Sequence, residues 1–585
     1  MYTIEKAKQN IANKINKNVE THYKVSLADL VLPPNPEMGD LSFACFSLSK
    51  EMKKNPVEVA SDLAKKIKPC QTVKSIEAAG PYLNFKLQPK KLAQGVLSET
   101  GKKDCGQINI GKNKKVLVEF ACPNVNKPFH IGHLRNIILG ESIVRLLESA
   151  NYKVVRVNYP SDIGMNIAKS IWGITQMQLK LKKVADKDIS KKMEFLGKAY
   201  ARGSQEYEKN EKAKLEINEI NKLIYKKDES VKKLYNTARG WSLKYFDIIY
   251  KRLNSHFDKT YFESEVVDSA LKIVQAGLKK GVFRLSEGAV IFEGGKHGLH
   301  DRVFINSAGL PIYEAKDLAL AKKHLSDYKP SKIIHVVAQE QAEYFKVVFK
   351  ALENLIPNSK GIEEHLSYGM VNLKGVKMSS RLGNVITTED LLNQTKSEII
   401  KIVKKNKEIK DKPSHTYGGA GEEDTAEKIT IAAVKYSMLK SGKEKNIIFD
   451  LKESVSLSGN SGPYLQYSYA RIQSILTKVK KLKSLKVKKS NSEYFSYIKN
   501  IEHKLLLKLA LFPDITKEAV EKYEPALVAK YLFELSQEFN DYYHQAPILK
   551  AKPEERAFRL ELLKSVAIIL DRGINLLGFE TVDKM

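Results

Sequence analysis

Apolar and polar positions alternate along the middle of the chain in the order expected for a parallel sheet. An apolar strand is predicted at 116–121, followed by a loop, a helix at about 131–150 and a second strand, KVVRVNY, at 153–159. The β-branched run KIIHVV at 332–337 predicts a further buried parallel strand. This β-loop-α-β order is typical of a doubly wound α/β domain with a Rossmann-type sheet.

The regions on either side of this sheet show different patterns. Residues 1–108 predict an α+β unit with an opening helix, a helix over 47–67 and the alternating strand YLNFKL at 82–87. Lys- and Glu-rich helices followed by short strands predict one insertion at 176–290. The segment YGMVNLKG at 368–375 predicts a strand that ends at a glycine turn.

The remainder of the chain is expected to be helical. Residues 412–424 have the glycine, proline and charge of a surface loop, and 425–585 predict an all-α bundle with a basic linker at 478–489. We therefore expect an appended domain at 1–108, a Rossmann-type α/β domain at 109–395, a linker at 396–424 and the bundle at 425–585.

Composition narrows the class of protein. The chain has 585 residues with 43% hydrophobic and 28% charged residues, which excludes a small stapled module and a disordered chain. Its four cysteines form no CxxC pair, and we assign no residues to a metal site. No signal-like segment and no run of 18 apolar residues occurs, so we expect a cytoplasmic protein without contact to a membrane.

The formal net charge of +30 has two explanations. A polyanionic partner such as nucleic acid would account for it. A lysine-rich background that places Lys on every solvated face would account for it equally well. Composition alone leaves both open.

The loop after the first strand, EFACPNVNKPFHIGHLRN, has the residues of an anion site. His130 and His133 flank the start of a helix, where free backbone N–H groups and the helix dipole favour anions. Gly132 leaves room for a flat ring, and Lys127 adds a positive charge, so a nucleotide triphosphate would suit this loop. A single histidine here would more often be a capping or packed residue; the pair with glycine favours binding. No GxGxxG or P-loop motif accompanies it.

A second cationic loop, KMSSRLGN, begins with Lys377, Met378 and Ser379. By itself it would be only a solvated turn. Together with HIGH, it resembles the two signature motifs of class I aminoacyl-tRNA synthetases. The segments LPIYEAKDLALAKKH, YGMVNLKGVKMSSRLGN and GNSGPYLQYSYARIQSI are similar to those of the arginyl-tRNA synthetase family, and the resemblance covers nearly the whole chain.

The resemblance implies a two-step reaction with ATP and Mg²⁺, L-arginine and tRNA-Arg. Arginine would attack the α-phosphorus of ATP, and a terminal ribose hydroxyl of the tRNA would then attack the arginyl adenylate. Members of the family are usually monomers, and they generally need tRNA for activation. Lys127, His130, His133 and Lys377 would stabilise charge on the phosphates. ATP is expected to contact Lys127, His130, Gly132, His133, Met370, Lys377, Met378 and Ser379.

An arginine substrate requires carboxylates, because the guanidinium is a rigid fork of donors. Tyr313 and Asp317 lie one helical turn apart and would hold the guanidinium. The resemblance implies an amino-acid site formed by Glu119, Asn124, His133, Tyr313, Asp317 and Gln341. Asn124 and Gln341 would orient the α-amino and carboxylate groups. Taken singly, Glu119 and Asp317 could be solvated surface acids, and Gln339 could replace Gln341.

Two positions depart from the family pattern. Ser380 stands where a second lysine of the KMSKS motif is usual, and Lys127 can supply that charge. Asn166 stands where a glutamine is more usual.

Two surfaces are expected to bind tRNA. Tyr82 and Asn84 match contact positions of the family's appended domain, which meets the D-arm. The bundle resembles a DALR-type anticodon-binding domain. Tyrosines at helical spacing, as in this bundle, belong more often to a hydrophobic core than to a nucleic-acid-binding surface. The expected contacts there are Tyr464, Arg471, Asn540, Tyr543 and Met585. Whether the insertion at 176–290 meets the acceptor stem or is only solvated stays open.

Two alternatives remain. The cysteinyl enzyme has a similar helical domain, but it needs a zinc-thiolate site that this sequence does not contain. A non-catalytic RNA-binding relative could keep the fold, but the intact HIGH motif, Lys377 and Asp317 favour an enzyme.

Overall fold

The computed structural model describes residues 3–375, 386–408, 420–481, 495 and 498–585. Its centre is a parallel five-stranded sheet of order β12-β11-β5-β6-β7. The strands are β5 (Lys115–Glu119), β6 (Lys153–Asn158), β7 (Lys259–Thr260), β11 (Lys332–Ala338) and β12 (Glu363–Tyr368). The predicted strands β5, β6 and β11 are confirmed, whereas β7 and β12 were not predicted. The segment at 368–375 forms β13 (Val371–Leu373), which leaves this sheet and pairs with β14 (Ile447–Phe449).

Helix α5 (Ile131–Ser149) connects β5 to β6 and is buried on nearly all faces. Its polar residues contact distant parts of the chain. The Arg135 guanidinium donates to the carbonyl oxygens of Gly369 at 3.1 Å, Met438 at 2.5 Å and Lys443 at 2.9 Å. The Ser142 hydroxyl donates to the carbonyl oxygen of Leu576 at 2.8 Å. Helix α5 therefore joins the sheet to the C-terminal helices.

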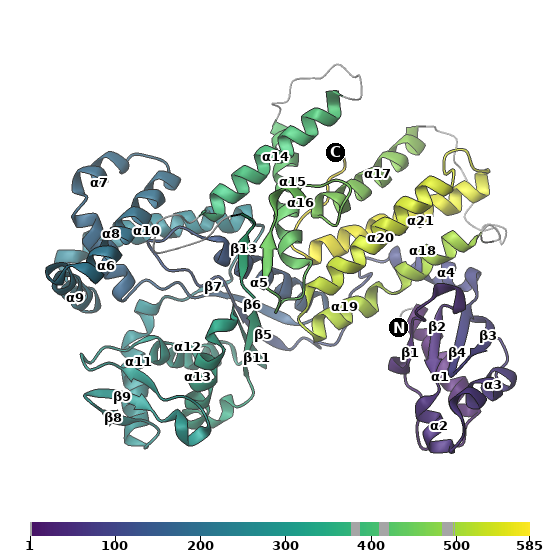
Figure 1. Ribbon diagram of the computed structural model, residues 1–585, viewed down its shortest axis with the longest axis horizontal. Coiled ribbons are helices and arrows are strands. Elements are labelled where there is room, and N and C mark those ends of the chain that lie inside the picture. Colours follow the sequence, from purple (N-terminus) through teal and green to yellow (C-terminus); the bar gives the residue numbers. More distant parts are fainter. Residues whose placement is uncertain (1–2, 376–385, 409–419, 482–494, 496–497) are drawn as a thin grey trace.

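The region predicted as one insertion consists of two units, because β7 returns to the central sheet between them. The first unit is helical and lies at the left of Figure 1. It contains α6 (Met165–Thr175), α7 (Gln178–Val184), α8 (Ile189–Lys209), α9 (Glu211–Tyr225) and α10 (Glu229–Arg252). The second contains α11 (Glu263–Lys279), the antiparallel strands β8 (Arg284–Ser286), β9 (Ala289–Phe292) and β10 (Arg302–Ile305), and then α12 (Tyr313–Tyr328), after which the chain enters β11. Helix α13 (Ala342–Leu355) connects β11 to β12. The prediction of a single insertion ending at residue 290 was wrong in this respect.

The N-terminal unit is an antiparallel sheet of order β1-β2-β4-β3 with four helices. The helix predicted over 47–67 is two helices, because Lys53 adopts a left-handed conformation (φ 51°) and Asn55 caps a new helix that begins at Pro56. The elements are α1 (Thr3–Lys17), β1 (Leu30–Val31), β2 (Leu41–Ala44), α2 (Phe46–Met52), α3 (Pro56–Lys66), β3 (Val73–Ala79), β4 (Tyr82–Leu87) and α4 (Pro89–Thr100).

The predicted helical character of 425–585 is confirmed, apart from the short strand β14 within it. Helix α14 (Thr388–Glu408) precedes this range, and α15 (Ala420–Leu439) begins inside the loop predicted at 412–424, so the last residues of that loop are helical. The other helices are α16 (Leu451–Ser454), α17 (Gly462–Lys481), α18 (Asn500–Ala510), α19 (Phe512–Glu521), α20 (Pro525–Gln545) and α21 (Pro553–Leu576). The boundary predicted after residue 395 falls inside α14, and most of the predicted linker at 478–489 lies outside the described residues. No helix among the described residues is long and apolar enough to span a membrane.

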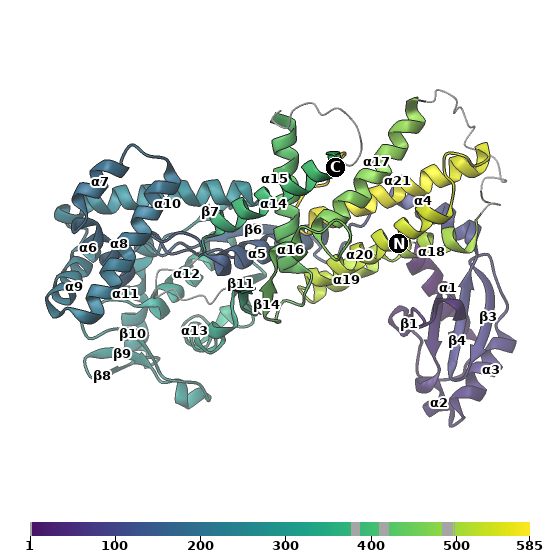
Figure 2. The same ribbon diagram turned by 45° about the horizontal axis from the view of Figure 1, so that its top comes forward.

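The molecule is elongated. Figures 1 and 2 place helices α6–α10 at one end and the N-terminal unit at the other, below α18. The N-terminal unit contacts the bundle through His503 Nε2 and Asp40 Oδ2 at 2.9 Å, and through an ion pair of Lys8 with Asp514 at 2.7 Å. The central sheet therefore lies between two peripheral units.

Candidate active site

The HIGH motif forms the start of helix α5. His130 is the N-cap, and its Nδ1 accepts a hydrogen bond from the backbone N–H of Gly132 at 3.1 Å. His133 Nδ1 accepts from the backbone N–H of His130 at 3.3 Å, and the two imidazole rings lie 3.9 Å apart. Because both Nδ1 atoms accept, both Nε2–H groups are left as donors at the positive end of the helix.

The electrostatic surroundings keep both imidazoles uncharged. Part of the His130 ring is exposed, yet desolvation and the charge of Lys127 lower its pKa. The pKa of His133 lies well below its ordinary value, because of burial and the neighbouring His130 and Lys127. At neutral pH the pair therefore offers hydrogen-bond donors to a phosphate, and Lys127 supplies the positive charge of the loop.

The loop between β5 and α5 has an unusual backbone conformation that polar side chains maintain. Ala121 and Cys122 adopt positive φ values of 69° and 41°. The Ala121 N–H donates to Asn136 Oδ1 on α5, and the Cys122 N–H donates to Asn158 Oδ1 on β6 at 3.2 Å. Asn136 and Asn158 were not predicted, since nothing in their local sequence indicates a partner in this loop.

Lys127 contacts the helical insertion. Its Nζ lies 3.8 Å from the centroid of the Tyr200 ring on α8. The sequence predicted a positive charge at this position, and the structure places it on an aromatic ring. Tyr200 was not predicted as a site residue.

Lys377, Met378 and Ser379 lie outside the described residues, and so does Ser380. The chain that follows them returns to the HIGH loop. The Thr388 N–H donates to the carbonyl oxygen of Phe129 at 2.8 Å, and the Thr388 hydroxyl donates to the carbonyl oxygen of His130 at 3.1 Å. Met370, which precedes Lys377 in the sequence, is 45% exposed.

A chain of titratable groups crosses three strands of the sheet. Glu119 on β5 contacts His335 Nδ1 on β11 at 3.1 Å, and His335 Nε2 contacts Glu363 on β12 at 2.7 Å. Burial would lower the pKa of His335, but the two carboxylates raise it well above its ordinary value. Burial would raise the pKa of Glu119, but His335 holds it below its ordinary value. The second carboxylate oxygen of Glu119, Oε2, is buried and accepts no hydrogen bond from the described residues.

Asp317 lies close to this chain, in the second turn of α12. Its Oδ2 accepts a hydrogen bond from the Tyr344 hydroxyl at 2.6 Å. Burial raises the pKa of Asp317 to about 7; the Tyr344 hydrogen bond opposes this rise, and the charges of Glu119 and Glu263 add to it. Three carboxyl groups thus influence one another: Glu263 is paired with Lys316 and Glu119 with His335, whereas Asp317, which is half-buried, has the neutral Tyr344 hydroxyl as its partner. Such a site favours a cationic ligand.

The other predicted amino-acid contacts lie at the same edge of the sheet but make few contacts. Tyr313 begins α12 and is 50% exposed, with Lys316 Nζ 4.6 Å from its ring centroid. Asn124 forms an isolated β-bridge with Ser161. Gln341 is exposed at the end of a short 3₁₀ helix after β11, and Gln339 of the same helix is exposed as well.

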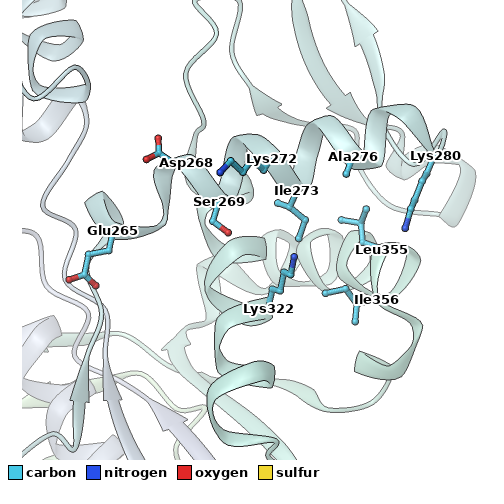
Figure 3. A pocket seen from close by; sticks show the side chains of 10 residues that line it. All are labelled: Glu265, Asp268, Ser269, Lys272, Ile273, Ala276, Lys280, Lys322, Leu355 and Ile356. Carbon is cyan, nitrogen blue, oxygen red and sulfur yellow. The ribbon is translucent and has the colours of Figure 1, made fainter.

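A surface hollow of about 500 Å³ lies elsewhere, between α11, α12 and the end of α13. Figure 3 shows Lys272 and Lys280 from α11 and Lys322 from α12 around its apolar floor of Ile273 and Leu355. No predicted site residue lines this hollow, so it is distinct from the HIGH loop and the carboxylates. In the described part of the chain, no group of three or more His, Cys, Asp or Glu could hold a metal ion.

Comparison with known proteins agrees with this geometry. Residues 94–451 match the family described as tRNA synthetases class I (R), catalytic domain. Residues 5–87 match the arginyl tRNA synthetase N terminal domain, and residues 465–585 match the DALR anticodon binding domain.

The chain belongs to the arginyl-tRNA synthetase family. An arginine–tRNA ligase of Treponema denticola is 34% identical over 93% of this chain and 92% of its own length. One from Clostridium botulinum is 32% identical over 98% and 99%. The structure of Thermus thermophilus arginyl-tRNA synthetase superposes with a TM-score of 0.79 at 25% identity, covering 99% of this chain and 100% of that one. Arginyl-tRNA synthetase from Plasmodium falciparum, at 21% identity and a TM-score of 0.75, shares the fold over 100% and 98%.

The N-terminal domain of this arginyl-tRNA synthetase family member presents one of its two predicted tRNA residues. Tyr82 is 41% exposed at the start of β4, and its ring meets exposed Phe46 edge to face at a centroid distance of 6.0 Å. Asn84 is 3% exposed, and its side-chain oxygen accepts no hydrogen bond from the described residues. The structure therefore presents an aromatic pair, and the amide of Asn84 lies beneath the surface.

In the DALR domain, most predicted tRNA residues come together between α17 and α20. Arg471 donates to Asn540 Oδ1 at 2.7 Å and to the Tyr467 hydroxyl at 2.8 Å. Its guanidinium lies 5.1 Å from the centroid of the Tyr543 ring, and Asn540 donates to the Tyr464 hydroxyl at 2.9 Å. These residues form one aromatic and cationic surface.

Met585 lies elsewhere in the DALR region. It packs against a small apolar cluster that includes Ile399 on α14 and Ala426 and Ile429 on α15. The predicted contacts thus divide between two places in the bundle.

Proposed function

We propose that this chain is an arginine–tRNA ligase that activates L-arginine with ATP and transfers it to the 3′-terminal ribose of tRNA-Arg. The observation that carries the proposal is the group of buried carboxylates next to the HIGH loop. Glu119 has a buried oxygen without a donor among the described residues, and Asp317 has its pKa raised by burial and by neighbouring negative charge. A guanidinium would satisfy both, because it brings a positive charge and a fork of N–H donors.

In the arginine complex, Asp317 and Tyr313 hold the guanidinium, and Glu119 faces it from the strand. Asn124, His133 and Gln341 orient the amino and carboxylate groups of the substrate. Their placement at the carboxyl edge of the sheet supports these roles, since ligands of open α/β sheets bind there. Tyr344 fixes the orientation of Asp317 through its 2.6 Å hydrogen bond.

The triphosphate of ATP binds at the start of α5. The neutral imidazoles of His130 and His133 donate hydrogen bonds from Nε2, and Lys127 contributes charge. Gly132 lets the His130 ring keep its place at the start of the helix, since a Cβ at position 132 would meet His130 Cε1 at 2.9 Å. The remaining proposed ATP contacts are Met370, Lys377, Met378 and Ser379.

Mg²⁺ would enter together with the triphosphate, where it neutralises phosphate charge. The described residues offer no carboxylate and imidazole cluster for it, which fits an ion held mainly by phosphate oxygens.

Two displacements make up the reaction. An oxygen of the arginine carboxylate attacks the α-phosphorus of ATP, a P–O bond forms, and the bond to pyrophosphate breaks. The ribose hydroxyl of tRNA-Arg then attacks the carbonyl of the adenylate, and AMP leaves. Neither step needs a side-chain nucleophile, so catalysis depends on position and on charge stabilisation.

Transfer requires tRNA-Arg to reach the active site while it contacts the outer domains. The aromatic pair at Tyr82 and the cluster around Arg471 are the proposed contact surfaces. Because one chain carries all of these surfaces, we propose that the enzyme acts as a monomer, and we propose the cytoplasm as its location.

The test is pyrophosphate exchange into ATP with each amino acid, with and without tRNA-Arg. Exchange should require arginine and tRNA-Arg together. Exchange with another amino acid would assign a different synthetase, and no exchange with any amino acid would favour a non-catalytic RNA-binding protein. Asp317→Asn should abolish exchange, whereas Asp327→Asn, on the same helix and bound to Tyr261, is the matched control.

A further inference from the structure

The helical insertion contacts the HIGH loop residue by residue. The Asn126 N–H donates to the Ser242 hydroxyl of α10 at 3.0 Å, and both residues are buried. The Phe129 ring stacks on Phe246, also on α10, with centroids 4.7 Å apart and an interplanar angle of 6°. Helix α10 therefore supports both ends of the segment from residue 126 to 129.

Helix α8 contacts the two residues between them. A Cβ at Gly197 would lie only 3.2 Å from Pro128 Cδ, so α8 and the loop are in close contact at this point. One turn further along α8, the Tyr200 ring lies beneath Lys127 Nζ at 3.8 Å. Gly197 and Tyr200 lie one turn apart on α8, so the close approach of α8 to Pro128 at Gly197 also brings the Tyr200 ring close to Lys127.

The ring of Tyr200 is fixed from its other end as well. Its hydroxyl donates to Asn166 Oδ1 on α6 at 3.4 Å, which gives a partner to the position that departs from the family pattern. Burial would raise the pKa of Tyr200, but Lys127 and the Ser204 hydroxyl, together with the charge of Lys169, hold it below its ordinary value. The Lys127 ammonium also lowers the pKa of His130 and of His133, so its charge lies near both imidazoles.

We propose that Tyr200 is a positioning residue for the activation step: its ring holds the Lys127 ammonium beside His130 and His133, where the triphosphate binds. This inference rests on the proposed function of the HIGH loop. It gives the insertion a role in ATP activation that does not depend on contact with tRNA. A lysine without the ring would distribute over several rotamers, and only a fraction of molecules would present the charge correctly.

A second lysine–tyrosine pair, between α6 and α8, provides a matched control. Lys169 Nζ lies 4.2 Å from the Tyr207 ring centroid, and the Tyr207 hydroxyl contacts Asn218 at 3.3 Å. This pair has the same chemistry and a similar geometry, but Tyr207 lies about two turns along α8 from Tyr200. Its partners Lys169 and Asn218 belong to α6 and α9, and neither is part of the HIGH loop.

The experiment measures pyrophosphate exchange with tRNA-Arg, first at varied ATP and then at varied arginine concentration. Tyr200→Leu should lower kcat by about three- to tenfold, the range of a partly exposed cation–π contact, with a smaller change in KM for arginine. Tyr200→Phe, which keeps the ring, should retain most of the activity, and Tyr207→Leu should match the wild type. In a Lys127→Met background, Tyr200→Leu should have no further effect. If Tyr200→Leu does not fold, Tyr200→Met replaces it.

Several outcomes would overturn the inference while leaving the proposed function intact. An unchanged or higher kcat in Tyr200→Leu, an equal loss in Tyr207→Leu, or the full loss repeated in the Lys127→Met background would each show that the ring does not act through Lys127. A wild-type protein without arginine-dependent exchange would instead refute the proposed function itself.

Discussion

Arginine binding should be linked to the release of a proton from Asp317. In the free protein the pKa of Asp317 is about 7, because the carboxyl group is buried and lies near Glu119 and Glu263. The guanidinium requires the ionised carboxylate, so binding must lower this pKa. A raised carboxyl pKa means that the protonated form competes with the substrate as the pH falls.

The size of the effect follows from that pKa. At pH 8 about nine tenths of the Asp317 side chains are ionised, and at pH 6 about one tenth. The Kd for arginine should therefore weaken about tenfold between pH 8 and pH 6, and binding at pH 6 should release about one proton. His133 has a pKa well below its ordinary value, and the pKa of His324 is about 4, so neither should titrate in this range.

Calorimetric titration with arginine, in two buffers of different ionisation enthalpy, measures both the Kd and the released protons. Tyr344→Phe removes the hydrogen bond that lowers the Asp317 pKa, so the midpoint should move to higher pH. Lys435 also has a pKa of about 7, but its Nζ donates to the carbonyl oxygen of Gly578, away from the proposed arginine contacts, so Lys435→Met should keep the pH dependence of the Kd. A Kd that stays constant from pH 6 to 8 in the wild type would refute the reasoning, and so would a pH dependence that disappears in Lys435→Met.

Three further predictions concern other parts of the molecule. Lys127→Ala should slow adenylate formation about a hundredfold, because it removes a charge at the triphosphate; wild-type activation kinetics would contradict this. His335→Phe leaves Glu119 and Glu363 buried without their partner and should lower the free energy of unfolding by about 3–5 kcal/mol in urea titrations. Because the pKa of His335 is raised, this difference should be complete below about pH 6.5 and shrink only as the pH rises through that raised pKa. Arg471→Ala should raise KM for tRNA-Arg in aminoacylation assays and leave KM for arginine unchanged; a change in the latter would contradict a role confined to tRNA.

The parts of the fold that local patterns determine were predictable. The strands β5, β6 and β11 have apolar runs, and helix α5 begins at a histidine pair with glycine, so each was visible within a short window of sequence. Strand β12 has the sequence EEHLSY, whose charged residues hide its place in the sheet. Two of those polar residues, Glu363 and His365, lie at the edge of the site, where they contact His335 and the carbonyl oxygen of Val337.

The site was predictable only in part, because its supporting contacts are distant in sequence. His335 and Glu119 are 216 residues apart, and pairing of β5 with β11 brings them together. Tyr200 lies on a lysine-rich helix that resembles a solvated surface, and only the packing of α8 against the loop shows its contact with Lys127. Asn84 was expected to contact tRNA, but it is buried. The alternating pattern of a strand does not show which face of the sheet other parts of the chain cover.

The position of α5 has a consequence for the synthesis of the protein. This helix leaves the ribosome early, but Arg135 binds carbonyl groups as far along the chain as Lys443, and Ser142 binds Leu576 near its end. The side of α5 that packs against α15 and the later helices therefore stays uncovered during most of translation, and contacts of such long sequence separation form slowly. A nascent chain interrupted before the last helix carries an intact nucleotide loop on a helix whose packing partners are incomplete, so we expect such fragments to aggregate or to require a chaperone.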